Sequence, residues 1–223
     1  MNFDVKYMLE VLITIIKYVP LTIIIAVLSM VFAVILGLIM ALIRNNKIIV
    51  LDKIAAVYIS FFRSIPTLVE LFLIYYGLPQ LFPVFNKMDA MTAAIIGLSL
   101  KESSYLAEIF KAALTSVDKG QLEACLGVGI SKLNAYKRII LPQATVNAIP
   151  GMSNTFISLL KETSLAFTLG LADLFAQGKM MASESLKFSE AYLAVAIIFW
   201  GLVIICSLVQ KILEKRLGRP YNV

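Results

Sequence analysis

Residues 19 to 43 read VPLTIIIAVLSMVFAVILGLIMALI, a stretch with no charged side chain that ends immediately before Arg44. About twenty apolar residues in a helix are enough to cross the hydrocarbon core of a bilayer. A chain inside that core has to satisfy its own backbone hydrogen bonds, and a helix does so within one segment. The stretch therefore predicts a transmembrane helix, and with it an integral membrane protein of the all-α class.

The composition extends this prediction to the whole chain. Of the 223 residues, 60% are hydrophobic, and the mean hydropathy is +0.89. A soluble domain of this size could not bury so much apolar surface. Because the remaining segments are short, residues 1–223 are predicted to form a single transmembrane domain with no separate soluble domain.

Further apolar stretches follow the first one. Pro66 fits a helix start, and Pro79 and Pro83 fit the end of the same helix. Polar residues interrupt two of the later stretches without shortening them below the length of a span. The prediction is about five transmembrane helices, at residues 19–43, 64–85, 91–114, 146–168 and 191–210.

The basic residues predict the orientation of these helices. The net charge is +6, but Lys and Arg gather at the ends of spans, so we predict membrane topology as the cause and no nucleic-acid partner. Basic loops stay on the cytoplasmic side. One side holds thirteen basic residues and the other five, which places the N-terminus outside and the C-terminus in the cytoplasm. The larger set is Arg44, Lys47, Lys53, Arg63, Lys111, Lys119, Lys132, Lys137, Arg138, Lys211, Lys215, Arg216 and Arg219, and the smaller set is Lys6, Lys17, Lys87, Lys179 and Lys187.

A polar and basic segment, DKGQLEACLGVGISKLNAYKRIILP at 118–142, lies between the third and fourth predicted spans. Asp118 is a suitable helix cap. Gly127 and Gly129 interrupt the helical pattern and permit a sharp turn. The segment is predicted to form short helices on the cytoplasmic side, able to pass force between a partner and the spans, although a solvated loop fits the pattern too.

The spacing of residues in this segment is specific. Glu123-Ala124, Gly129, Ile139 and Leu141-Pro142 follow the order E-A-A-x3-G-x9-I-x-L-P, with Cys125 at the third position. This spacing resembles the EAA loop of the permease subunits of ABC importers. Cys125 departs from the motif's alanine, and because both residues are small the packing is expected to survive.

Three longer stretches resemble one subfamily of these permeases. They are FRSIPTLVELFLIYYGLP, SYLAEIFKAALTSVDKGQLEA and LLKETSLAFTLGLADL. The likeness covers about residues 15–215 and is closest to amino acid ABC importer permeases of the histidine/glutamine/cystine/arginine type. The fold implied is that of a type I ABC importer permease, with a cytoplasmic coupling helix in residues 118–142.

The resemblance implies partners and coupling residues. Two ABC ATPase subunits, a second permease copy or paralogue, and an extracytoplasmic amino-acid-binding protein are expected, in a bacterial plasma (inner) membrane with its lipids. The chain contains no GxxxxGK[ST] phosphate loop, so ATP and Mg are expected in the ATPase subunits; no cofactor, metal or enzymatic activity is predicted for this chain. The residues expected to couple to the ATPase are Gly120, Glu123, Ala124, Gly129, Leu141 and Pro142.

Charged residues inside the predicted spans are candidates for the substrate pathway, because such groups are costly there. An amino acid carries an ammonium and a carboxylate, and the neighbours Lys101–Glu102 and Lys161–Glu162 can supply both opposite signs. The same charges also fit ion pairs across the bundle, and for Lys101 and Glu102 both interpretations stay open. The predicted pathway residues are Lys101, Glu102, Ser104, Asn154, Ser158, Lys161, Glu162, Thr163 and Ser164.

The function predicted is therefore the translocation of a polar amino acid, driven by ATP hydrolysis in a partner subunit. Cystine, glutamine, histidine and arginine all fit. A permease of the same class for another small polar solute is one alternative. A secondary transporter driven by an ion gradient is the other, although it would not require a cytoplasmic docking motif.

Overall fold

The computed structural model describes residues 3–46 and 49–218, and every regular element in these residues is a helix. The all-α prediction is confirmed. Lys47 and Arg219, which contributed to the predicted orientation, lie outside the described residues.

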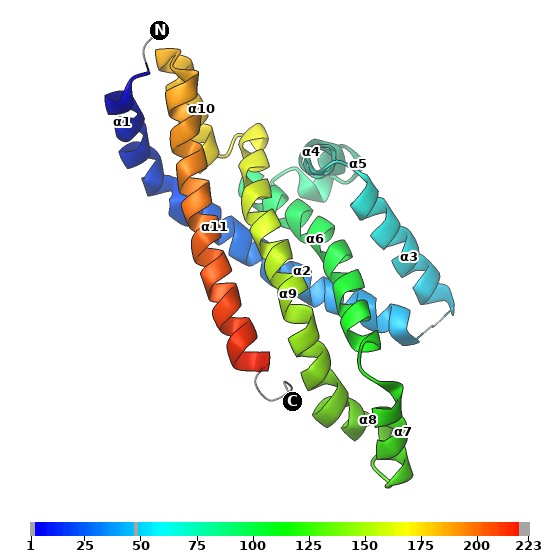
Figure 1. The fold of residues 1–223 in the computed structure, drawn as a ribbon. Coiled ribbons are helices and arrows are strands. Elements are labelled where there is room, and N and C mark those ends of the chain that lie inside the picture. Colours follow the sequence, from blue (N-terminus) through cyan, green and yellow to red (C-terminus); the bar gives the residue numbers. More distant parts are fainter. Residues whose placement is uncertain (1–2, 47–48, 219–223) are drawn as a thin grey trace.

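Four long helical runs make up most of the bundle (Figure 1). The first run joins α1 and α2 through a short 3-10 turn, η1, and the other three are α6, α9 and α11. The bounds are α1 Val5–Ile15, η1 Ile16–Tyr18, α2 Val19–Asn46, α6 Ala90–Thr115, α9 Leu141–Glu162 and α11 Phe188–Gly218. Shorter elements are α3 Ile49–Ser64, α4 Thr67–Phe72, the π-helical turn η2 Leu73–Gly77, α5 Leu78–Leu81, η3 Pro83–Phe85, α7 Lys119–Gly127, α8 Lys132–Ala135, the π-helical turn η4 Tyr136–Ile140, η5 Thr163–Leu169 and α10 Leu174–Ser185.

Helices α2 and α6 lie against each other in the same direction. Ser99 of α6 donates a hydrogen bond to the carbonyl of Ser29 in α2, at 3.2 Å. Further along, a Cβ atom at Gly37 would meet the Cβ of Leu106 at 2.8 Å, so only glycine permits this approach. Small residues let helices approach closely in a membrane, where apolar side chains gain little by leaving lipid. This contact forms the centre of the bundle.

Three groups of buried apolar residues follow the bundle from end to end. One, including Ile25, Leu98 and Leu159, fills the half of the bundle near α4. A second fills the half near α7 and includes Ala33, Leu106 and Ala148. The third joins α1, α10 and α11 and includes Val11, Ile15, Leu174 and Val195. Helix α1 therefore packs with the hairpin of α10 and α11, while α2 packs with α6.

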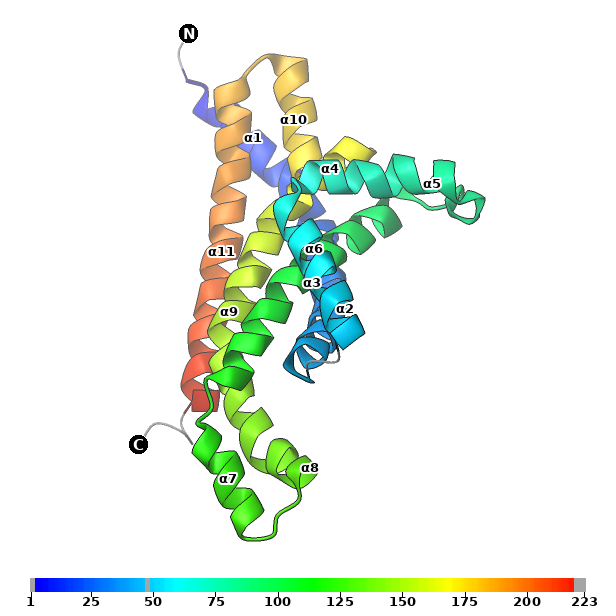
Figure 2. The ribbon, with the colours of Figure 1, turned by 90° about the vertical axis from the view of Figure 1, so that its right-hand side faces the viewer.

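The second predicted span, 64–85, contains one helical run, Thr67–Leu81, which follows a helix, α3, that was not predicted. The chain forms α3 first and then bends by 110° between Ile49–Ser64 and Thr67–Leu81. Figure 2 shows α4 and α5 running sideways out of the bundle. The bend falls at Ile65–Pro66, because a proline disfavours helical conformation in the residue before it. Helix α3 was not predicted from the sequence, because the charged residues Asp52, Lys53 and Arg63 make this segment less apolar than a typical span.

Arg63 is one of the thirteen basic residues that were assigned to the cytoplasmic side. In the structure it lies at the end of α3 that approaches the middle of α6, with its guanidinium 5.2 Å from the ring centroid of Tyr105. Arg44 instead forms an ion pair with Asp52 across the turn from α2 to α3, at 3.0 Å.

Two helical runs among the described residues are long and apolar enough to cross a bilayer, Val5–Asn45 and Phe188–Arg216, and the bent pair adds a third if it is one span. Helices α6 and α9 have the predicted length but a more polar composition. They lie inside the bundle between these runs (Figure 1), and α6 buries Ser99, Lys101 and Glu102. Burial in protein explains how polar helices are accommodated at membrane depth. The number of five spans stays a prediction.

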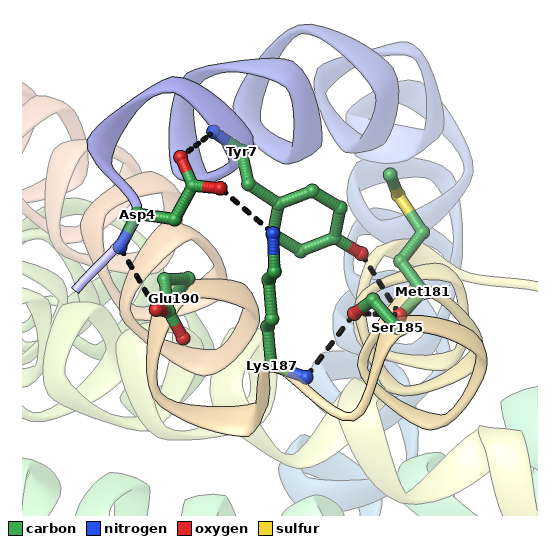
Figure 3. Close-up of polar contacts among 6 residues, drawn as sticks. All are labelled: Asp4, Tyr7, Met181, Ser185, Lys187 and Glu190. Carbon is green, nitrogen blue, oxygen red and sulfur yellow. Dashed lines mark hydrogen bonds and ion pairs between the residues drawn. The ribbon is translucent and has the colours of Figure 1, made fainter. Parts of the chain in front are cut away.

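A polar clasp fastens the start of the first helix to the hairpin of α10 and α11 (Figure 3). The Lys187 ammonium donates to Asp4 Oδ2 at 2.7 Å. The backbone N–H of Asp4 donates to Glu190 Oε1 at 3.0 Å, and the Tyr7 hydroxyl donates to the carbonyl of Met181 at 2.9 Å. The clasp joins segments that are far apart in sequence, so α1 and α11 are held as one unit.

The clasp is expected to weaken at low pH. Hydrogen bonds from Lys187 and from the backbone of Tyr7 lower the pKa of Asp4 below its ordinary 3.8. A lowered folded-state pKa gives stability that is present above the unfolded-state value and is lost as the pH falls through the folded-state value. We predict that the melting temperature of the purified protein falls more steeply with acid in the wild type than in Asp4→Asn. Equal acid profiles for the two proteins would show that the clasp contributes nothing.

Candidate functional site

A cluster of buried polar side chains lies where α4, α6 and the end of α9 meet. The Lys101 ammonium donates to the Thr67 hydroxyl oxygen and lies 3.8 Å from Glu162 Oε2. The Thr67 hydroxyl donates to the same Glu162 oxygen at 3.1 Å. The threonine therefore bridges an ammonium and a carboxylate, and each partner comes from a different element.

Local structure brings these three residues together. The bend at Pro66 places Thr67 at the first position of α4 beside α6. Helix α9 ends at Glu162, and the tighter 3-10 turn η5 follows to Leu169 and is capped by Gly170, where φ is +91°. The turn η5 lies against α4 and α6.

Two more carboxylates lie in this region. Glu102 is 3% exposed and Glu70 is 1% exposed. Neither carboxylate oxygen of Glu70 has a hydrogen-bond partner among the described residues. The cluster therefore contains three acidic side chains and one buried lysine, so it offers groups of both signs with an excess of carboxylate.

The contact across the bundle is one of the two interpretations that the sequence left open. Lys101–Glu102 and Lys161–Glu162 were predicted as neighbours that supply both signs, and their ion-pair partners were not specified. Neighbours in a helix point about 100° apart, and the structure joins Lys101 to Glu162 across two helices. Lys161 is exposed. Thr67 was not predicted, because its role arises only from the bend at Pro66.

Three hydroxyls from the predicted pathway donate to backbone carbonyls three residues earlier in the chain. Ser104 donates to the carbonyl of Lys101, Thr163 to that of Leu160 and Ser164 to that of Lys161, at 2.5, 2.8 and 2.7 Å. Ser104 and Thr163 are fully buried. Their oxygens stay available as acceptors, but their hydrogens are committed to the backbone.

Helix α9 presents a polar stripe on one side. Asn147, Asn154 and Lys161 are exposed, and Ser158 is half-buried. The intervals of three, four and seven residues place these side chains on one helix face. An amide or ammonium facing lipid is costly. The stripe therefore fits a polar pathway or a protein partner better than it fits lipid.

The polar segment forms a helical hairpin of α7 and α8 below the bundle (Figure 1). Asp118 caps α7 by accepting from the backbone N–H of Gly120 at 2.6 Å, as predicted. Gly129 has a φ of +82°, a conformation that favours glycine, and it makes the turn between the two helices.

The predicted coupling residues lie along this hairpin and its exit. Glu123 and Ala124 are exposed on α7, while Cys125 beside them is buried. Leu141 and Pro142 form the first turn of α9. The tip of the hairpin also exposes four apolar side chains that the motif did not single out. These are Leu126, Val128, Ile130 and Leu133, with Val128 76% and Leu133 78% exposed.

Exposed apolar side chains next to many charged groups mark a protein contact surface. The basic side chains of the hairpin and of the turn after it are exposed, and they indicate an aqueous setting rather than lipid. These are Lys119, Lys132, Lys137 and Arg138.

The comparisons with known proteins agree with this architecture. Residues 33–219 match the family described as "Binding-protein-dependent transport system inner membrane component". The chain belongs to this family of binding-protein-dependent permeases. The resemblance drawn from the EAA-loop spacing is thereby confirmed, and the chain is a membrane-embedded permease subunit of an ABC transporter.

Individual relatives of this permease cover its whole length. The probable amino-acid permease protein YxeN of Bacillus subtilis is 62% identical, with 99% of each chain covered. The L-cystine transport system permease protein TcyL of Bacillus subtilis is 39% identical over 97% of this chain and 92% of its own. The structure described as "an amino acid ABC transporter with histidines" has a TM-score of 0.87 and 32% identity, covering 97% of this chain and all of that chain.

Proposed function

We propose that this permease subunit carries a polar amino acid into a bacterial cell across the plasma membrane. The names of its relatives support this substrate class, since they include an amino-acid permease and an L-cystine permease. The high structural similarity to an amino acid ABC transporter supports it as well.

The observation on which the proposal rests is the pairing of Lys101 with Glu162 beside the polar stripe of α9. An amino acid has a carboxylate and an ammonium, and each needs an opposite charge once water is removed. Lys101 offers an ammonium, and Glu162, with its side chain 25% exposed, offers a carboxylate at the accessible edge of the cluster. The stripe of Asn154, Ser158 and Lys161 would continue this polar surface along α9.

A second copy or paralogue would complete the pathway. In one chain the α9 stripe has no cover, and lipid is a poor one. Two α9 helices facing each other would enclose a polar channel between them. Closing one end of that channel while the other opens would provide alternating access around the cluster.

The energy would come from ATP hydrolysis in a partner. We propose that an ATPase subunit docks on the apolar tip of the α7–α8 hairpin, with Glu123 and Ala124 beside this surface. Two permease copies would then hold two ATPase subunits, and ATP and Mg would bind in those subunits. The hairpin is then cytoplasmic, which sets the N-terminus outside and the C-terminus inside. An extracytoplasmic binding protein would deliver the amino acid at the opposite end, where the clasp lies.

The proposal is tested by initial uptake of labelled amino acids in cells that lack this protein and in the same cells complemented with it. We expect one chemical class of amino acid to lose uptake and to regain it on complementation. The panel includes cystine, glutamine, histidine and arginine, together with a dipeptide and a sugar as controls. Restoration of a non-amino-acid solute alone would support the same transporter class with a different cargo and would overturn the proposed substrate.

A further inference from the structure

Two glutamine side chains join the hairpin to the membrane helix. Gln143 Nε2 donates to Gln121 Oε1 at 2.6 Å, and Gln121 Nε2 donates to Gln143 Oε1 at 3.2 Å. Gln143 Nε2 also donates to the carbonyl of Ile139 at 2.9 Å. Both amides are half-buried, and Gln121 belongs to α7 while Gln143 belongs to the first turn of α9.

Helix α7 buries one residue, Cys125, and its Leu122 is partly buried against the apolar group near α7. The side chain of Asp118 caps the helix, and Gly129 makes the turn after it. A second polar contact supports the same region, because the Asn147 amide donates to the Ser116 hydroxyl at 2.8 Å. That contact joins α9 to the end of α6 and does not involve α7. The reciprocal glutamine pair is therefore the side-chain hydrogen-bonded link from α7 to α9, beside the apolar packing of Leu122.

Helix α9 connects this link to the proposed pathway. It begins at Leu141 and ends at Glu162, so Gln143 lies in its first turn and the Lys101 partner lies in its last. The polar stripe lies between these two ends. A displacement applied to Gln143 would act directly on the helix that bears Glu162.

We propose that Gln121 and Gln143 are positioning residues that transmit movement of the hairpin to α9. The inference rests on the proposed function, because it assumes that an ATPase moves the hairpin. The pair holds the docking element and the pathway helix at a fixed separation while the ATPase opens and closes. Without the Gln121–Gln143 pair, α7 moves with the ATPase, but this movement is not transmitted to α9.

The hydrogen-bond pattern gives the pair a direction that can be tested. Gln143 Nε2 donates to two acceptors, Gln121 Oε1 and the Ile139 carbonyl, whereas Gln121 Nε2 donates to one, Gln143 Oε1. A lysine at 143 can donate to both acceptors, and a glutamate at 121 can receive one of those bonds. The reversed pair, a lysine at 121 and a glutamate at 143, leaves the Ile139 carbonyl without this donor.

The test uses the complete transporter, reconstituted in proteoliposomes with its ATPase and binding protein. We expect Gln121→Ala and Gln143→Ala to reduce uptake about five- to tenfold, the range for one lost hydrogen-bonded link, while the ATPase subunits stay bound. The ratio of transported substrate to hydrolysed ATP should fall. The double variant Gln121→Glu/Gln143→Lys should recover most of this ratio, and Gln121→Lys/Gln143→Glu should recover less. Thr145→Val, exposed on the neighbouring turn of α9, is the matched control and should behave as wild type.

The possible outcomes separate this inference from the proposed function. A wild-type transporter that moves no amino acid contradicts the proposed function, whatever the variants do. A working wild type whose single variants keep a normal transport ratio contradicts the positioning role. Loss of bound ATPase in the single variants also contradicts it, since the pair would then support docking rather than transmission. Equal recovery by both double variants would show that any ion pair is enough and that the Ile139 contact has no part.

Discussion

Replacing Lys101 by methionine is expected to reduce amino acid uptake by about a hundredfold or more. The substitution leaves Glu162 without its ammonium partner beside the buried carboxylates Glu70 and Glu102. Removing one member of a buried ion pair destabilises a protein by about 3–5 kcal/mol, and a loss of that size in the binding of the substrate carboxylate would correspond to more than a hundredfold. The measurement is initial uptake in proteoliposomes at equal amounts of inserted protein.

A double variant separates transport from folding. In Lys101→Met/Glu162→Leu both charges are gone, and replacing a buried pair by apolar residues is often neutral for stability. We expect this variant to regain the melting temperature that Lys101→Met loses and still to transport nothing. If the double variant transports at the wild-type rate, the pair serves structure alone and our assignment of the pathway fails.

Placing an aspartate at the hairpin tip is expected to release the ATPase. Val128 and Leu133 are the most exposed apolar residues of the tip, and burying each in an interface contributes about 1.5–3 kcal/mol. Val128→Asp and Leu133→Asp should each weaken ATPase binding at least tenfold, and together they should abolish copurification and uptake. Binding is measured by copurification in detergent and by titration of the ATPase onto the immobilised permease.

Asn134→Asp is the matched control for these substitutions. It adds the same charge to the same hairpin at an exposed polar position, so we expect nearly normal ATPase binding. Wild-type binding by the double variant of Val128 and Leu133 would show that the ATPase docks elsewhere.

Glu123→Ala should leave the helices inserted while reducing uptake.

The sequence predicted the helices whose composition is uniform. The runs at 19–43 and 191–210 correspond to α2 and α11, because a long apolar stretch has few alternatives to a helix in lipid. Helix α3 was missed because its charged residues hide a helix that packs on α6. The bend at Ile65–Pro66 was missed too, since Pro66 fits both a helix start and a helix break.

For the candidate site, the sequence left ion pairs across the bundle as one open interpretation, but it did not specify which residues would pair. Lys101 and Glu162 were both expected, from the cost of charges inside spans. Their mutual contact, and the Thr67 hydroxyl between them, depend on how α4, α6 and α9 cross, and a single sequence does not specify this. The Gln121–Gln143 link was missed for the same reason: the two residues are 22 positions apart and belong to separate elements.

The central claim is that a partner ATPase drives an amino acid through this subunit. Its most direct test uses proteoliposomes that contain the permease, its ATPase and the binding protein. The measurement is the uptake of the labelled amino acid that the panel of labelled amino acids identifies as the substrate. We predict uptake that requires ATP on the side of the membrane where the ATPase is bound and that stops when the ATPase is omitted. Dissipating the proton and sodium gradients should leave this uptake unchanged. Uptake that continues without ATP and collapses with an ion gradient would contradict the account and would identify a secondary transporter.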